Sequence, residues 1–94
     1  MQTEAEFTAA VREFAMLCGW LFYHTHDSRR SDPGFPDCVM TDGKRVIFAE
    51  LKVGKGKPTE AQMEWISLLL AAGQQVHIWR PETDWPAIEA ALKP

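Results

Sequence analysis

Three residues in the middle of the chain, Asp37, Glu50 and Lys52, have the types and spacing needed for phosphodiester hydrolysis. Two carboxylates supply the oxygen ligands that a hard divalent ion such as Mg²⁺ prefers, with water and a substrate phosphate completing its octahedron. Such an ion polarises a phosphodiester and lowers the pKa of a bound water. A nearby lysine can orient or deprotonate that water, or stabilise charge that develops on the phosphate. The alternative is an ordinary surface aspartate and a Glu–Lys ion pair on a solvated sheet face.

The dipeptide Asp42-Gly43 predicts the hairpin that would bring these residues together. It lies between two apolar segments, and both positions of a two-residue hairpin turn favour positive φ. Such a turn pairs Thr41 with Lys44, and counting back along the strands places Asp37 opposite Phe48.

The length of this turn decides which side chains share a face of the sheet. Because side chains repeat every two residues, Phe48, Glu50 and Lys52 lie on the face of Asp37. Asp37 and Glu50 are then diagonal neighbours, about 7 to 8 Å apart at the backbone. A four-residue turn keeps this parity, whereas a three-residue turn would break it by placing Asp37 opposite Ala49.

Capping boxes and apolar spacing predict the elements around this hairpin. In each box a Ser or Thr side chain and a Glu or Gln side chain three residues later satisfy free backbone N–H groups. The boxes are Thr3 with Glu6, before a helix over about 4–18, and Thr59 with Gln62, before a helix that ends at Gly73. Strands are expected at 20–25, 36–41, 44–53 and 75–80, and a short helix capped by Thr83 or Asp84 ends at Leu92. The order αβββαβα indicates an α/β fold whose sheet is covered by helices.

Length and composition predict one small globular domain spanning residues 1–94. Hydrophobic residues make up 46% and charged residues 24%, which argues against disorder. Cys18 and Cys38 form neither a disulfide framework nor a zinc spacing, so reduced thiols are expected. No apolar run is long enough to cross a bilayer, and the N-terminal residues lack the pattern of a secretory signal. These features predict a cytoplasmic protein.

The net charge of −3 by itself argues against a polyanionic partner, but the distribution of the charges along the chain changes this inference. Residues 28–57 hold seven basic against four acidic side chains, or +3, and the rest of the chain carries −6. A positive middle on an acidic body is a local footprint for nucleic acid, because local potential matters more than the total. An ordinary solvated surface is the alternative.

The motif around these residues resembles that of a known nuclease superfamily. Gly34-Phe35-Pro36-Asp37, twelve intervening residues and Glu50-Leu51-Lys52 look like the PD-(D/E)XK motif. The basic glycine loop after it and the helical Gln62, followed by Trp65 and Ala72-Gly73, sharpen the likeness. Together, from about Thr3 to Arg80, they resemble the VRR-NUC family, the virus-type replication and repair nucleases.

This resemblance implies a restriction-endonuclease-like αβββαβ core with a short C-terminal helix and a mixed sheet flanked by helices. It also implies Mg²⁺- or Mn²⁺-dependent cutting of DNA, with no other cofactor, in the cytoplasm of a bacterium or a phage-infected host. Small stand-alone members resemble homodimers that cut branched DNA such as Holliday junctions. Three rivals remain: a DNA-binding module with a weak site, a subunit dependent on a replication or recombination partner, and an RNA nuclease.

The resemblance also assigns roles to particular residues. Asp37, Glu50 and the backbone carbonyl of Leu51 would bind the metal, Lys52 would be the catalytic lysine, and Gln62 would lie over the site. The family tends to add an acid from its first helix, here Glu4 or Glu6. We prefer Glu4, because Glu6 already serves the capping box.

Basic and imidazole side chains flank the predicted site in sequence. Arg29, Arg30, Lys55 and Lys57 are expected to contact phosphate, with solvated loops as the alternative. His24 and His26 share a face and could contact phosphate or act as auxiliary acid and base groups, with strand-end packing as the alternative. The four tryptophans are expected in the core or an interface, and no aromatic platform for base stacking is evident.

Overall fold

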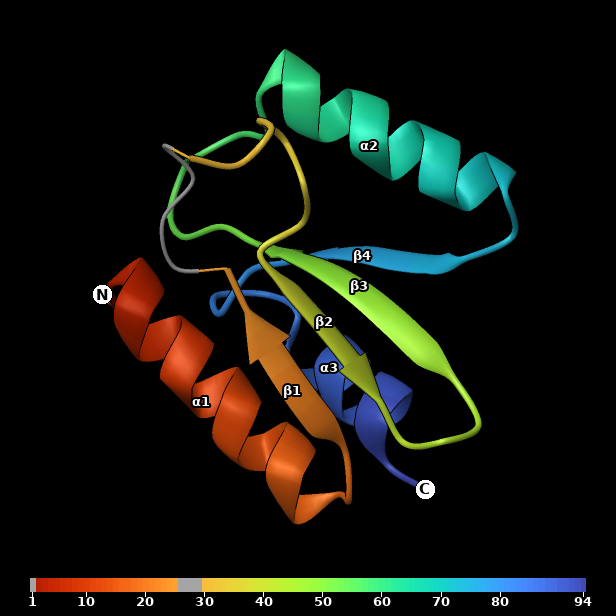
Figure 1. Ribbon diagram of the computed structural model, residues 1–94. Coiled ribbons are helices and arrows are strands. Elements are labelled where there is room, and N and C mark those ends of the chain that lie inside the picture. Colours follow the sequence, from red (N-terminus) through yellow and green to blue (C-terminus); the bar gives the residue numbers. More distant parts are fainter. Residues whose placement is uncertain (1, 26–29) are drawn as a thin grey trace.

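The computed structural model describes residues 2–25 and 30–94. Both predicted capping boxes form, and each stands at the start of one of the two long helices. Thr3 and Glu6 bond each other's backbone N–H at the start of α1 (Glu4–Leu17), with distances of 3.1 and 2.8 Å. Thr59 and Gln62 do the same at the start of α2 (Glu60–Ala71). The remaining elements are β1 (Leu21–His24), β2 (Cys38–Thr41), β3 (Val46–Leu51), β4 (Gln75–Trp79) and α3 (Trp85–Leu92). This is the predicted order of elements (Figure 1).

The last helix begins where predicted, without the predicted side-chain cap. Asp84 occupies the N-cap position but makes no cap hydrogen bond. Its carboxylate instead accepts the backbone N–H of Arg80 at 2.8 Å and the hydroxyl of Thr83 at 3.2 Å. The side chain therefore braces the loop before α3 rather than the helix itself.

The sheet is mixed, with the strand order β1-β2-β3-β4. The first three strands are antiparallel, and α2 is the crossover that returns the chain so that β4 pairs with β3 in parallel. No helix in the described part of the chain is long and apolar enough to cross a membrane.

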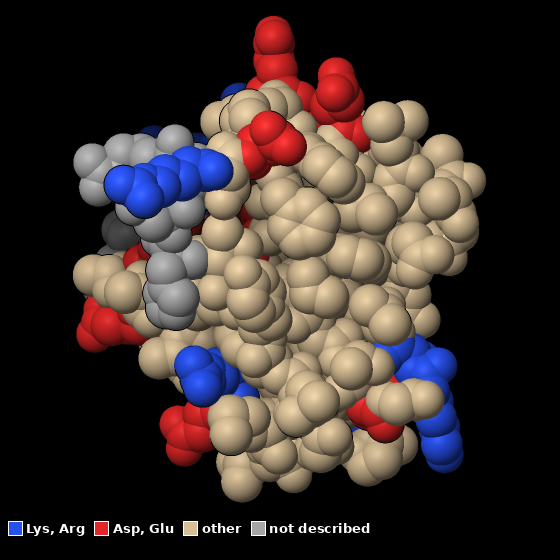
Figure 2. All heavy atoms as spheres, in the orientation of Figure 1, with Lys and Arg blue, Asp and Glu red and all other residues tan. Residues whose placement is uncertain are grey.

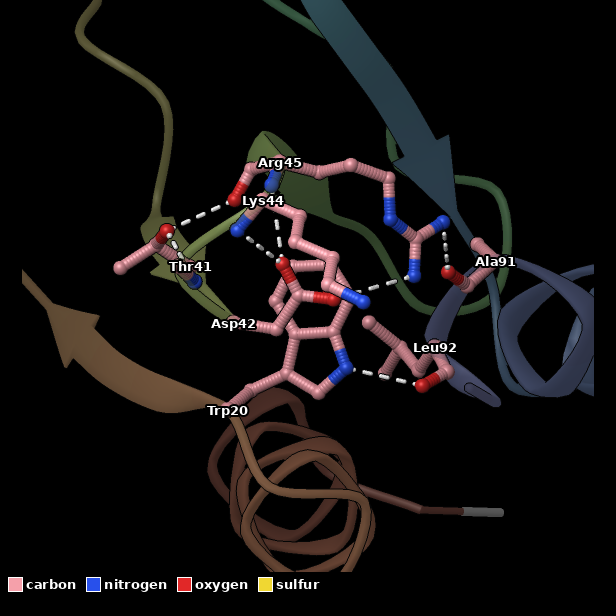
Figure 3. Close-up of polar contacts among 8 residues, drawn as sticks. Trp20, Thr41, Asp42, Lys44, Arg45, Ala91 and Leu92 are labelled. Atoms are coloured by element: carbon pink, nitrogen blue, oxygen red, sulfur yellow. Dashed lines mark hydrogen bonds and ion pairs between the residues drawn. The ribbon is translucent and has the colours of Figure 1, made fainter.

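The hairpin turn has four residues, so the two-residue turn predicted from Asp42-Gly43 is wrong. Thr41 pairs with Val46, and the turn comprises residues 42–45. The Asp42 carboxylate causes the difference, because one oxygen accepts the backbone N–H groups of Lys44 and Arg45 at 2.9 and 2.8 Å (Figure 3). An aspartate that bonds the backbone two and three residues ahead favours this longer turn.

The parity of the side chains is preserved, as expected for a four-residue turn. Cys38 pairs with Ala49. One residue further, Asp37 comes opposite Glu50, so the two carboxylates are direct rather than diagonal neighbours.

One face of the sheet is buried under α1 and α3. Phe7 and Val11 of α1 and Ile88 of α3 are fully buried against Met40 and Ile47 of the sheet. Trp20 links the end of α1 to the end of α3. It lies between α1 and β1, and its indole N–H donates to the carbonyl of Leu92, the last residue of α3, at 2.8 Å (Figure 3). Cys38 is buried in the same core as a free thiol.

The opposite face is only partly covered. Trp65 of α2 packs edge-on against Phe35, which contacts Phe48 of β3 in the same way. Over β1 and the hairpin the face is open, leaving Leu21 77% and Tyr23 63% exposed. Figure 2 shows this side as a broad surface whose centre carries no charged side chains, with Lys, Arg, Asp and Glu gathered around the rim.

Candidate active site

The Asp37 and Glu50 carboxylates each hold the backbone of the opposite strand at the open end of the β2–β3 hairpin. The backbone N–H of Asp37 donates to Glu50 Oε1 at 3.1 Å, and the backbone N–H of Leu51 donates to Asp37 Oδ2 at 2.9 Å. Each carboxylate thus bonds across to the other's strand. This reciprocal pair of bonds fixes the orientation of both side chains.

Glu50 is a buried carboxylate with an incompletely satisfied oxygen. Its side chain is 0% exposed, and Lys52 Nζ lies 3.2 Å from Oε2 as an ion pair. The geometry of that contact is not that of a hydrogen bond, so Oε2 has no hydrogen-bond partner among the described residues. Burial, and then the charge of Asp37, raise the pKa of Glu50 to about 7, although the Lys52 ammonium opposes the shift.

Asp37 and Glu50 are adjacent carboxylates, and among the described residues the buried Glu50 Oε2 has no hydrogen-bond partner. Such a pair of groups suits a hard divalent cation. A buried charge that lacks sufficient compensation destabilises the protein, and a cation bound beside it removes that cost. Within residues 2–25 and 30–94, no three carboxylate, imidazole or thiol groups converge as a ready metal site. The donor set therefore supports an ion that keeps several ligands from water or substrate, as Mg²⁺ does.

The pKa of Glu50 predicts how the stability of the metal-free protein depends on pH. Between about pH 4.5 and about pH 7 the folded protein holds a proton that the unfolded chain has lost, so stability falls as pH rises through this range. We expect a loss of about 2 to 3 kcal/mol between pH 4.5 and pH 8. Glu50→Gln removes this loss, as measured by urea unfolding in EDTA at both pH values. An unchanged pH dependence in the variant would contradict the assignment.

Asp37 opens into a polar cavity of about 440 Å³ formed where four segments meet. They are the start of α1, the end of β1, the loop before β2 and the start of α2. The residues lining it are Glu4, His24, Thr25, Pro33, Gly34, Phe35, Asp37, Thr59 and Gln62. Four of these, Glu4, His24, Asp37 and Gln62, are among the predicted site residues.

The two candidate acids of α1 lie in different places. Glu4 lines the cavity, whereas the Glu6 carboxylate is engaged in the capping box, where the backbone N–H of Thr3 lowers its pKa. This arrangement favours Glu4 as the residue that faces the cavity. Glu4 nonetheless does not join Asp37 and Glu50 in a preformed three-residue cluster.

Gln62 reaches the cavity with half of its amide already engaged. Its Oε1 accepts the backbone N–H of Thr59 at 2.8 Å in the capping box of α2. The amide N–H₂ group is therefore what Gln62 can offer a substrate.

The predicted phosphate contacts are only partly within the described residues. Lys55 and Lys57 are exposed on the loop between β3 and α2, and Arg30 is exposed beyond β1. His26 and Arg29 lie outside the described residues.

The loop that carries Asp37 is tied to its surroundings by contacts that sequence reasoning missed. The backbone N–H of Thr25 donates to the carbonyl of Asp37 at 3.0 Å, which joins the end of β1 to the site. Gly34 has φ +95°, and its Cα approaches α2 so closely that a Cβ would lie 2.4 Å from the carbonyl oxygen of Ala61. The sequence shows a glycine at position 34, before Phe35-Pro36-Asp37, but it gives no sign that this glycine contacts Ala61.

The sheet order, the parallel crossover through α2 and the helices that flank the sheet define a restriction-endonuclease-like fold. Among solved structures, a VRR_NUC domain protein matches with a TM-score of 0.74 at 18% identity, over 97% of this chain and 88% of that one. Hjc of Archaeoglobus fulgidus, a Holliday junction resolvase from an archaeal hyperthermophile, matches with a TM-score of 0.62 at 15% identity. That match covers 84% of this chain and 70% of the resolvase. The VRR-NUC resemblance and the predicted fold class are thus confirmed at the level of the fold.

The similarity to known proteins lies in the structure rather than in the amino-acid sequence. No family profile matches the sequence, and no curated protein matches it either.

Proposed function

We propose that this protein is a metal-dependent DNA endonuclease that hydrolyses phosphodiester bonds. The observation that carries the proposal is the reciprocal pairing of Asp37 and Glu50 beside Lys52, at the edge of a polar cavity. A surface aspartate with a solvated Glu–Lys pair would not account for a fully buried glutamate.

The residues at the hairpin end divide the work. Asp37, Glu50 and the carbonyl of Leu51 would hold a Mg²⁺ or Mn²⁺ ion, which when bound supplies a water of lowered pKa and a Lewis acid for the phosphate. The N–H of Leu51 holds Asp37 Oδ2 in orientation. Lys52, 15% exposed, keeps its ammonium at Glu50 Oε2, where it can orient water and neutralise charge on the phosphate.

The cavity supplies further groups around the reacting phosphate. Glu4 would add a carboxylate from α1, and Gln62 would donate its amide N–H from α2. His24 also lines the cavity from the end of β1. Arg30 and the two loop lysines, together with Arg29 and His26 outside the described residues, would contact the flanking DNA backbone.

Branched DNA is the substrate class that we propose. One structural neighbour is a Holliday junction resolvase and the other is a VRR_NUC domain protein, and their folds cover most of this chain. The second candidate is a catalytically weak DNA-binding subunit of a replication or recombination complex. It is favoured by the lack of a third carboxylate, imidazole or thiol beside Asp37 and Glu50 in the described part of the chain.

A cleavage assay on labelled substrates tests the proposal. Four-way junction, matched linear duplex, single strand and the RNA counterpart are incubated with Mg²⁺, Mn²⁺ or EDTA. We expect metal-dependent cutting of the junction in preference to the linear DNA. Junction binding in Ca²⁺ without cutting in any metal would select the binding-subunit candidate, and preferential cutting of RNA would overturn the choice of substrate.

The loop lysines should set the salt dependence of DNA binding. Replacing both Lys55 and Lys57 by Ala removes two exposed cations from the loop after Lys52. We expect weaker junction binding and a slope of log K against log salt that is shallower by about 2. Binding titrations between 50 and 200 mM salt in Ca²⁺ measure this slope, and an unchanged slope would mean that the loop does not touch phosphate.

We propose that two copies pair through the open sheet face, as a two-fold dimer would place two sites on a branched substrate. The centre of that face is uncharged, and monomers rarely expose apolar patches larger than a few hundred Å² (Figure 2). Leu21 of this face is 77% exposed, and Leu17 of α1, which is 78% exposed, offers a matched control.

Introducing a charge on this face should therefore abolish pairing. We expect Leu21→Glu to give a monomer by sedimentation equilibrium at concentrations where the wild type and Leu17→Glu are dimers. A monomeric wild type, or a Leu17→Glu variant that dissociates as readily, would contradict this interface.

A further inference from the structure

The loop between Lys52 and α2 is held from outside by the side chain of Arg80, which follows β4. The guanidinium donates through Nη1 to the carbonyl of Gly54 at 3.0 Å and through Nη2 to the carbonyl of Gly56 at 2.6 Å. Two carbonyls are thus bound by one planar group with a fixed fork geometry. This segment holds two glycines, and its residues 55–57 are exposed, so its backbone has more freedom to move than that of a buried strand.

The same end of β4 is braced by further bonds. Glu82 accepts the backbone N–H of Gly54 at 2.8 Å, and Asp84 accepts the backbone N–H of Arg80 at 2.8 Å. The backbone N–H of Lys52 donates to the carbonyl of Trp79 at 3.0 Å. Lys52 and Arg80 therefore each come directly after the last paired residues of β3 and β4, Leu51 and Trp79.

The folded-back loop lies against the side chain of Lys52. The N–H of Gly56 donates to the carbonyl of Val53 at 3.2 Å, which closes a turn. A Cβ built at Gly56 would lie 3.9 Å from Lys52 Cδ. Lys55 and Lys57 flank this glycine and point their charges to solvent from a backbone that Arg80 holds.

We propose that Arg80 is a positioning residue for the cleavage reaction. It orders the loop 53–58, which packs Lys52 toward Glu50 and presents Lys55 and Lys57 to the DNA backbone. In this role Arg80 acts through the two loop carbonyls that its Nη1 and Nη2 groups bind, rather than through the phosphate itself. The role rests on the proposed function, and the test separates the two.

Arg45 supplies a matched control. It lies in the β2–β3 turn, at the opposite end of the hairpin from Asp37, and its Nη1 likewise donates to a carbonyl, that of Ala91 at 3.0 Å (Figure 3). Its guanidinium also stacks over Trp20 and forms an ion pair with Asp42. Arg45→Gln therefore removes a structural arginine of similar type without touching the loop 53–58.

The experiment compares the wild type with Arg80→Gln, Arg80→Lys and Arg45→Gln by three measurements. The first is amide hydrogen exchange in residues 53–57, which does not depend on DNA. The second is the salt dependence of junction binding in Ca²⁺, and the third is the single-turnover cleavage rate in Mg²⁺.

For Arg80→Gln we expect exchange in the loop to be about tenfold faster. We also expect a shallower salt slope, by about 1, and cleavage about tenfold slower. Arg80→Lys keeps the charge but cannot hold both carbonyls, so it should resemble Arg80→Gln in exchange, slope and rate. Arg45→Gln should leave all three unchanged.

Several results would overturn the proposal. Unchanged exchange in Arg80→Gln would mean that Arg80 does not order the loop. Faster exchange with wild-type binding and cleavage would leave Arg80 a purely structural role. Full recovery of binding by Arg80→Lys despite a mobile loop would assign the effect to charge alone. A wild type that neither binds nor cuts DNA would overturn the proposed function, and the positioning role with it.

Discussion

We expect Asp37→Asn to abolish metal-dependent cleavage, lowering the single-turnover rate by at least about a thousandfold. The substitution removes one charge of the pair that would hold the ion, yet an amide oxygen can still accept the N–H of Leu51. The fold and the junction affinity in Ca²⁺ should therefore stay close to those of the wild type. The loss would lie in the chemistry rather than in folding or binding.

The control for this variant is Asp42→Asn. The Asp42 carboxylate, like that of Asp37, accepts backbone N–H bonds, here from Lys44 and Arg45 in the turn at the far end of the hairpin. We expect it to cleave at the wild-type rate. A rate for Asp37→Asn within tenfold of the wild type would refute the assignment of the site, as would an equal loss in Asp42→Asn.

Gly34→Ala should have the largest effect on stability among the glycine substitutions. The residue has φ +95°, and the added Cβ would lie 2.4 Å from the carbonyl oxygen of Ala61 in the backbone of α2. The strained backbone and the clash together should cost about 3 kcal/mol or more in the free energy of unfolding. The loop carrying Asp37 would also move away from α2, so activity should fall even where the protein remains folded.

Gly19→Ala separates the cost of the strained backbone from the cost of the clash with Ala61. Gly19 has φ +89°, nearly that of Gly34, but nothing lies within 4 Å of its Cβ position. It should lose only the conformational part, about 1 kcal/mol. Urea denaturation of both variants measures the difference, and equal losses would show that the loop does not pack on α2 as described.

Much of the fold could be predicted because its signals are local. The capping boxes mark helix starts through contacts three residues apart, and both formed as predicted. The order of strands and helices followed from apolar spacing in the same way. The turn length was wrong because Asp-Gly supports more than one turn, and the choice depended on which N–H groups the Asp42 side chain would accept.

The candidate site was partly predictable for a related reason. Hairpin parity was enough to place Asp37 and Glu50 on one face, since it survives a change from two to four turn residues. Parity does not reveal that Glu50 is fully buried or that each carboxylate accepts a backbone N–H from the opposite strand. The contact of Arg80 with Gly54 spans 26 residues, and no local pattern announces it.

The two crossed bonds that the Asp37 and Glu50 carboxylates accept from the opposite strand make the candidate site and the strand alignment a single set of contacts. The ends of a hairpin away from its turn are ordinarily where it frays first. Here that end is fastened by carboxylates, as the turn is fastened by Asp42. A slip of the strands by one residue would separate the two candidate carboxylates at once. Selection for activity in such a protein would also hold the sheet in register.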